Sequence, residues 1–141
     1  AWPEAMLLNR TGAPVKRGPA GVQLGYRRYD GASYTERWSA RITGRLLVNH
    51  TGVYTFWVSS DDGARLWLAG AKVLDAGETH NYTTHHCSAF LPLGEHELRL
   101  EYFQEDGPQG LVLEWGGPGM ARSVVPEGML ALPAGSECLH A

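Results

Sequence analysis

The sequence is poor in cysteine, has no excess of basic residues and contains no long hydrophobic segment, and each shortage excludes a class of protein. Only two of its 141 residues are cysteines, so a dense disulfide framework is excluded. Lys and Arg total 12 against 15 Asp and Glu, which leaves no basic surface and predicts no nucleic-acid partner. No apolar run approaches the roughly 20 residues of a membrane span, so we expect no membrane insertion of this domain.

The sequence also lacks the apolar pattern of a helix, whereas its strand signals are strong. No window repeats apolar residues with helical period over the roughly ten residues that a helix needs. The 18 Gly and 8 Pro are scattered as turn signals between short runs of β-branched and aromatic residues. We therefore predict an all-β fold, a two-sheet antiparallel β-sandwich, formed by a single domain over residues 1–141.

The predicted strands differ in their expected burial. Val53–Val58 is β-branched and aromatic throughout, which predicts a central strand buried on both faces. Residues 95–102 alternate between polar and apolar, so one face of that strand is expected to be buried. We expect the first twenty residues and the tail after Pro133 to be irregular. Further strands are expected at 25–29, 38–48, 65–68 and 111–115, with Trp57, Trp67 and Trp115 mostly in the core.

The two cysteines allow one internal pairing, Cys87 with Cys138, and the alternative is two free buried thiols. Three N-glycosylation acceptor sequences favour an oxidising secretory route, and hence the disulfide. Their asparagines are Asn9, Asn49 and Asn81. We therefore expect a secreted protein or one on the extracellular face of the cell surface. Because the chain begins at Ala1 with no signal-peptide pattern, we expect it to be part of a larger chain.

Several motifs occur in order along the middle of the chain. They are Trp38-Ser39, Gly52-Val53-Tyr54-Thr55-Phe56, Ser60-Asp61-Asp62-Gly63-Ala64-Arg65-Leu66 and Glu101-Tyr102-Phe103. As a set, they resemble the protective-antigen fourteen-kilodalton domain family, and the resemblance runs from Gly21 to Trp115. This β-sandwich module occurs in a bacterial toxin subunit, in adhesins and in cell-surface proteins. The resemblance implies that in lectin-like members an adjacent Asp pair, joined by a cis peptide, binds one calcium ion that coordinates sugar hydroxyls.

Asp61 and Asp62 match that pair, and the resemblance makes them calcium and ligand-binding residues. Calcium prefers six to eight oxygen ligands, which two carboxylates on one loop begin to supply. In the lectin-like members a second loop adds an Asn and backbone carbonyls, but residues 104–110 contain no Asn. Gln104 and Asp106 are the expected substitutes. From Asp-Asp-Gly without the resemblance, an ordinary turn is the alternative.

The sequence therefore predicts a calcium-dependent carbohydrate-binding module for adhesion or recognition, with a glycan or glycoprotein ligand. The alternative is a non-catalytic structural or protein-interaction domain in which calcium only stabilises a loop. An accessory domain beside a glycosyl hydrolase or transferase is a third possibility. A zinc site at His80, His85 and His86 with Cys87 is disfavoured, because adjacent histidines on a strand point to opposite faces.

We do not expect an enzyme. The sequence has no nucleophile elbow, no metalloprotease helix motif and no phosphate-binding loop. Acidic residues are available at Glu95, Glu97, Glu101, Glu105 and Asp106. The first three share the polar face of one predicted strand, which is typical of a solvated surface rather than of a catalytic cleft.

Overall fold

A computed structural model describes residues 4–8, 14–19, 38–78, 81–104 and 110–132, and these ranges are almost entirely β-strand. The strands are β1 (Glu4–Leu8), β2 (Pro14–Pro19), β3 (Trp38–Val48), β4 (Gly52–Asp61), β5 (Ala64–Leu68), β6 (Ala71–Ala76), β7 (Thr83–Leu91), β8 (Gly94–Gln104), β9 (Gly110–Gly117), β10 (Met120–Val124) and β11 (Leu130–Ala131). A 3-10 turn, Glu127–Met129, precedes β11. The described residues include no helix that is long and apolar enough to span a membrane.

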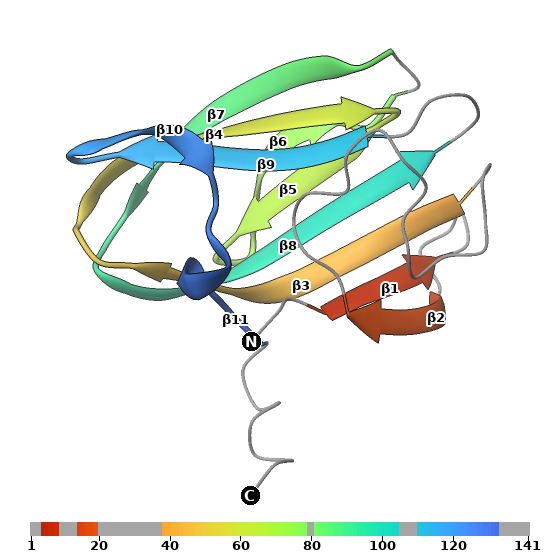
Figure 1. Cartoon of the computed structure of the whole chain (residues 1–141), viewed down its shortest axis with the longest axis horizontal. Helices are drawn as coiled ribbons and strands as arrows, with labels where there is room; N and C mark the ends of the chain where they lie inside the picture. The colour runs from red at the N-terminus through yellow and green to blue at the C-terminus, as the bar shows by residue number, and fades with distance from the viewer. Residues whose placement is uncertain (1–3, 9–13, 20–37, 79–80, 105–109, 133–141) are drawn as a thin grey trace, which may run out of the picture.

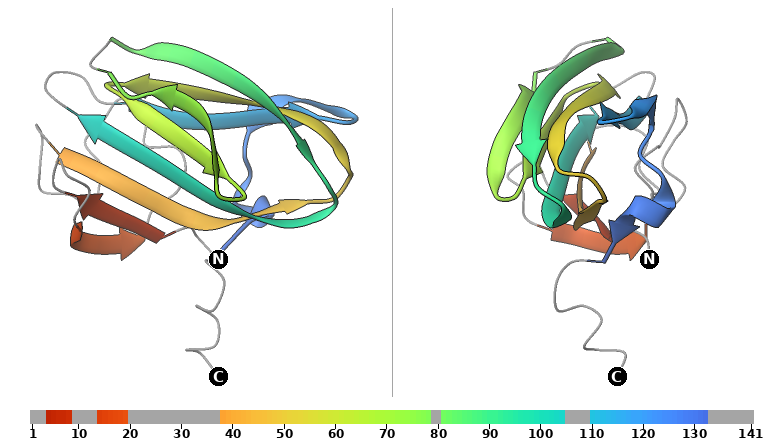
Figure 2. Two further views of the ribbon diagram at one scale, coloured as in Figure 1. Left: turned by 180° about the vertical axis from the view of Figure 1, so that it is seen from behind. Right: turned by 90° about the vertical axis from the view of Figure 1, so that its left-hand side faces the viewer.

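The strands form two antiparallel sheets that face each other, which confirms the predicted sandwich (Figures 1 and 2). The seven-stranded sheet has the order β2-β1-β3-β8-β5-β6, with β11 also paired to β3. The four-stranded sheet has the order β10-β9-β4-β7. The chain passes from the small sheet to the large one between β4 and β5, and returns between β6 and β7.

The core lies between the sheets and is built from alternate residues of the strands. Ile42 of β3 and Leu100 of β8 are fully buried and are cross-strand partners in the large sheet. They face Phe56 of β4 and Leu113 of β9 in the small sheet, which are also fully buried. Each such side chain contributes about 1.5–3 kcal/mol to folding by leaving water. The predicted alternation in residues 95–102 is confirmed, since Leu98, Leu100 and Tyr102 are buried.

The expectation of an irregular N-terminal segment was wrong. β1 pairs with β3 on one side and with β2 on the other, which makes β2 an edge strand of the large sheet. Pro14 and Pro19 lie at the two ends of β2, where a missing backbone N–H costs little. Because proline is typical of loops and turns, the sequence did not indicate a strand here. The expected strand at 25–29 and the tail after Pro133 lie outside the described residues.

The expectation that residues 53–58 are buried on both faces was also wrong. β4 is central in its sheet, but only its inner face is covered, so Val53 is 60% exposed whereas Tyr54 is buried. A sandwich covers one face of each sheet, and the outer face meets solvent. For the same reason Trp57 and Trp67 are half-buried on outer faces, stacked on Arg122 and Arg99, while Trp115 is in the core as predicted.

Candidate functional site

Asp61 and Asp62 lie at the crossing between the two sheets. Asp61 is the last residue of β4, and β5 begins three residues later, at Ala64, in the other sheet. The peptide bond between the two aspartates is cis, as the resemblance implies. Both residues are buried, with exposed fractions of 7% and 4%. The predicted ligand pair therefore sits inside the end of the sandwich rather than on an open surface turn.

The end of β8 holds this crossing in place. The Tyr102 hydroxyl donates a hydrogen bond to the backbone carbonyl of Asp61, and it lies 3.1 Å from Oε1 of Gln104. The next residue, Phe103, donates its backbone N–H to the carbonyl of Gly63 at 2.9 Å. Tyr102 and Gln104 are both fully or almost fully buried. The structure thus brings Gln104 into the neighbourhood of Asp61, with Tyr102 between them.

Tyr102 is a site residue that the residue pattern alone did not identify. Alternation in its strand placed it only on the apolar face, and it is indeed almost fully buried there. The only signal for a further role was its position in the Glu101-Tyr102-Phe103 element of the resemblance. A buried Tyr needs a hydrogen-bond partner for its hydroxyl, and here that partner is the backbone carbonyl of Asp61, one of the two predicted calcium ligands.

Gly63 is required by close packing. Its φ is not among the positive values, which in the described residues belong to Ala69, Gly70, Gly94 and Gly119. A Cβ atom on Gly63 would lie 2.1 Å from Cε1 of Phe103, far inside van der Waals contact. The side chain of Phe103 therefore packs directly over the backbone that follows Asp62.

The site is electrostatically negative. Burial raises the pKa of Tyr102 far above its usual range, and the negative charges of Asp61 and Asp62 raise it further. A backbone hydrogen bond from Gly110 opposes this rise. Tyr102 therefore stays protonated and keeps donating its hydrogen bond across the physiological pH range.

The donor set fits a hard cation. Asp61 and Asp62 supply carboxylate oxygens, Gln104 supplies an amide oxygen, and these are the ligands that calcium prefers. Within the described ranges no three His, Cys, Asp or Glu side chains cluster as metal ligands, so the two carboxylates need completion by amide or backbone oxygens. Asp106, the other expected ligand, lies outside the described residues.

The remaining predicted sites are only partly within the described chain. Asn49 and Asn81 are exposed, whereas Asn9 lies outside the described residues. Cys87 is half-buried, burial raises the pKa of its thiol, and it has no disulfide partner among the described residues. Because Cys138 lies outside those residues, the disulfide stays a prediction. His85 is half-buried and His86 exposed, consistent with the expected alternation.

Comparison with known proteins identifies a matching domain family and several proteins of similar sequence or fold. The PA14 domain family matches residues 29–128. The anti-sigma-I factor RsgI3 of Acetivibrio thermocellus is 27% identical over 96 residues, and the match spans 67% of this chain but only 15% of that protein. A solved anti-sigma factor domain-containing protein has a TM-score of 0.85 at 21% identity, over 95% of this chain and 48% of that one. A PA14 sugar-binding domain from an RTX adhesin has a TM-score of 0.74 at 15% identity, over 93% and 98%.

Proposed function

The chain belongs to the PA14 domain family, and from this premise we propose that it is a calcium-dependent carbohydrate-binding module. The observation that carries the proposal is the buried Asp61–Asp62 pair, held between the two sheets by Tyr102. The name of the RTX adhesin domain, which is similar in fold, describes it as sugar-binding. The ligand proposed for this chain is accordingly a glycan or a glycoprotein.

In this proposal Asp61 and Asp62 hold the metal, with Gln104 and Asp106 as the additional side-chain ligands. Calcium would supply a cationic centre to which the vicinal hydroxyls of a sugar coordinate. Tyr102 is a positioning residue, because its hydrogen bond fixes the carbonyl of Asp61 and so the course of the loop. Phe103 has a similar role through its backbone bond to Gly63.

The proposal includes a location and a chain context. An adhesion or recognition module acts in the secreted or cell-surface space. There the exposed Asn49 and Asn81 would carry glycans, and the predicted Cys87–Cys138 disulfide would form. The chain spans about 15% of the curated relative and about half of the anti-sigma structure, which supports a domain within a larger chain.

A second candidate function, a protein-interaction domain in which calcium only stabilises a loop, is favoured by an exposed apolar cluster. Val53 and Phe90 are cross-strand partners on the outer face of the small sheet, with exposed fractions of 60% and 65%. Leu93, just beyond β7, is also 65% exposed. The anti-sigma factors that this chain resembles are longer proteins, in which such a cluster could contact another domain.

Calorimetric titration of chelator-stripped protein with calcium tests the proposal. We expect one calcium ion to bind the wild type and none to bind the Asp62→Asn variant, because that change removes one carboxylate charge from the site. Asp75→Asn is the matched control, since the exposed Asp75 lies in a separate ion-pair network and should leave calcium binding intact.

A glycan array with and without chelator then separates the two functions. Calcium-dependent glycan binding supports the carbohydrate-binding module. Calcium binding without any glycan signal supports the interaction domain, and an absence of calcium binding in the wild type refutes the metal assignment altogether.

A further inference from the structure

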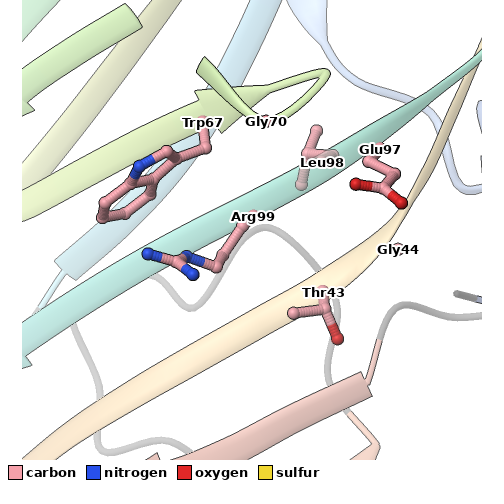
Figure 3. A pocket seen from close by; sticks show the side chains of 7 residues that line it. All are labelled: Thr43, Gly44, Trp67, Gly70, Glu97, Leu98 and Arg99. Carbon is pink, nitrogen blue, oxygen red and sulfur yellow. The ribbon is translucent and has the colours of Figure 1, made fainter. Parts of the chain in front are cut away.

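The outer face of the seven-stranded sheet carries a hollow that is separate from the Asp61–Asp62 site. Its volume is about 410 Å3, within the roughly 300–1,000 Å3 range of small-molecule sites. In Figure 3, Trp67 and Arg99 line one side of the hollow and Glu97 lies at its other end. Trp67 is five residues beyond Asp62, about 16 Å along an extended strand. The hollow is lined by Thr43, Gly44, Trp67, Gly70, Glu97, Leu98 and Arg99.

Strand register builds this hollow. Thr43, Arg99 and Trp67 are consecutive cross-strand neighbours on β3, β8 and β5, so their side chains emerge in one row on the outer face. Gly44 and its cross-strand partner Leu98 belong to the inward-facing row of the sheet, so they border the hollow between the outward-facing side chains. The backbone N–H of Ala69 donates to the carbonyl of Glu97 at 2.8 Å, which ties the β5–β6 turn to β8 at the far end.

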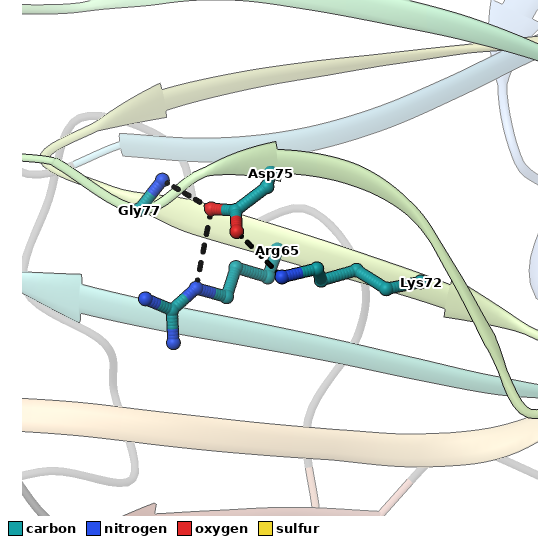
Figure 4. Close-up of polar contacts among 4 residues, drawn as sticks. All are labelled: Arg65, Lys72, Asp75 and Gly77. Carbon is teal, nitrogen blue, oxygen red and sulfur yellow. Dashed lines mark hydrogen bonds and ion pairs between the residues drawn. The ribbon is translucent and has the colours of Figure 1, made fainter.

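The side of the hollow formed by Trp67 is fixed from two directions. The guanidinium carbon of Arg99 lies 3.9 Å from the centre of the Trp67 ring, a cation–π contact. On its other edge β5 is joined to β6 by an ion-pair network (Figure 4). Asp75 accepts from Lys72 at 2.7 Å, from Arg65 at 3.2 Å and from the backbone N–H of Gly77 at 3.0 Å. The hollow is therefore a preformed feature of the sheet.

Its polar groups retain capacity for a ligand. Glu101 accepts from Arg41 at 3.0 Å, whereas Nε of Arg99 lies 3.6 Å from the same carboxylate oxygen. Among the residues that the structure describes, that Nε makes no hydrogen bond, but it is buried; the Arg99 side chain is 41% exposed, so other N–H groups of the guanidinium would have to reach a ligand. Glu97 is exposed at the rim and no hydrogen bond to its carboxylate is found in the described chain. The hollow thus offers a carboxylate, a guanidinium and the Thr43 hydroxyl beside an indole ring.

We propose that this hollow binds a neutral pyranose ring, without calcium. A sugar presents apolar C–H groups that can pack against the part of the Trp67 indole that Arg99 leaves uncovered, and hydroxyls that both donate and accept hydrogen bonds. Glu97 would accept from these hydroxyls and Arg99 would donate to them. An anionic ligand fits less well, because the positive charges of Arg99 and Arg41 are matched by the negative charges of Glu97 and Glu101. This proposal goes beyond the calcium-dependent function and does not rest on it.

The test is an NMR titration of the 15N-labelled protein, in chelator, with the methyl glycosides of glucose, galactose and mannose. We expect at least one of them to shift the indole N–H signal of Trp67 in a saturable way. Trp57 is the matched control within the same spectrum, since it stacks on Arg122 at 4.6 Å on the opposite sheet. It should show no saturable shift.

Three variants test which side chains contribute to glycoside binding in the hollow. Trp67→Ala should weaken binding about tenfold, read from the amide signals of Thr43 and Leu98. Glu97→Gln, an isosteric change at an exposed side chain, should weaken binding severalfold without affecting the fold. Asp62→Asn should leave the affinity unchanged. The proposal is overturned if none of the glycosides shifts Trp67, if Glu97→Gln binds as tightly as the wild type, or if binding requires calcium and Asp62. None of these results would disturb the calcium titration, so failure here and failure of the proposed function are distinguishable.

Discussion

Gly63→Ala should destabilise the domain markedly, because the structure leaves no room for one methyl group beside Asp62. The new Cβ would lie 2.1 Å from Cε1 and 2.6 Å from Cζ of Phe103, and 3.0 Å from the carbonyl oxygen of Ala76. Ordinary carbon contacts are about 3.5–4.0 Å. The Phe103 ring therefore has to move by more than about 1 Å, with the Ala76 carbonyl close on another side.

The backbone cannot absorb this shift cheaply. The Phe103 N–H donates to the Gly63 carbonyl at 2.9 Å, so separating the two residues would break a hydrogen bond. Overpacking of this kind costs about 1–3 kcal/mol. For a domain of this size, each kcal/mol lowers Tm by about 4 °C, so we expect a decrease of about 4–12 °C. Thermal unfolding followed by circular dichroism, in chelator, gives the measurement without a contribution from bound metal.

Gly128→Ala is the matched control, because a Cβ at Gly128 meets nothing within 4 Å. Its free energy of unfolding should change by no more than about 0.5 kcal/mol. The double variant Gly63→Ala with Phe103→Leu should recover part of the lost stability, since leucine lacks the ring atoms that clash. If Gly63→Ala unfolds at the same temperature as Gly128→Ala, the packing argument for Gly63 is refuted.

Two further predictions concern polar groups. Tyr102→Phe removes the hydroxyl that donates to the Asp61 carbonyl, and we expect a loss of about 1–3 kcal/mol in urea unfolding together with weaker calcium binding; unchanged calcium affinity would contradict the positioning role. The hydrogen bond from Lys72, with those from Gly77 and Arg65, lowers the pKa of Asp75 to about 2, so its contribution is fully present above about pH 4 and disappears as the pH falls through 2. Because Asp75 is 41% exposed, the difference in free energy of unfolding between wild type and Asp75→Asn should stay below about 1 kcal/mol at pH 7, and it should shrink as the pH falls through 2. A difference as large at pH 2 as at pH 7 would refute this assignment.

The sequence predicted the strands best where apolar residues alternate. β8 and β9 were placed correctly, because Leu98, Leu100, Leu111 and Leu113 all follow a period of two that only a half-buried strand explains. β2 was missed, since an edge strand bounded by prolines has the composition of a loop. The aromatic run of β4 led to an overestimate of its burial, because β-branched and aromatic residues also suit an exposed sheet face.

For the candidate site, the sequence predicted the Asp pair through the resemblance, but it could not predict the groups that hold it. Tyr102 lies 40 residues after Asp62 in the chain, and only the fold brings its hydroxyl to Asp61. The sequence also does not explain why Gly63 must be a glycine, since nothing in it indicates that the Phe103 side chain lies over this residue. The hollow beside Trp67 depends on the register of three strands, which no local pattern specifies.

Strand β8 has a consequence for avidity. It carries Arg99 on its outer face and Tyr102 on its inner face, three residues or about 10 Å apart along one rigid element. A glycan that occupied both sites would hold its second residue at an effective concentration set by this fixed spacing rather than by diffusion. The two contacts made by one glycan would then act together, provided that the length of the glycan matches this spacing.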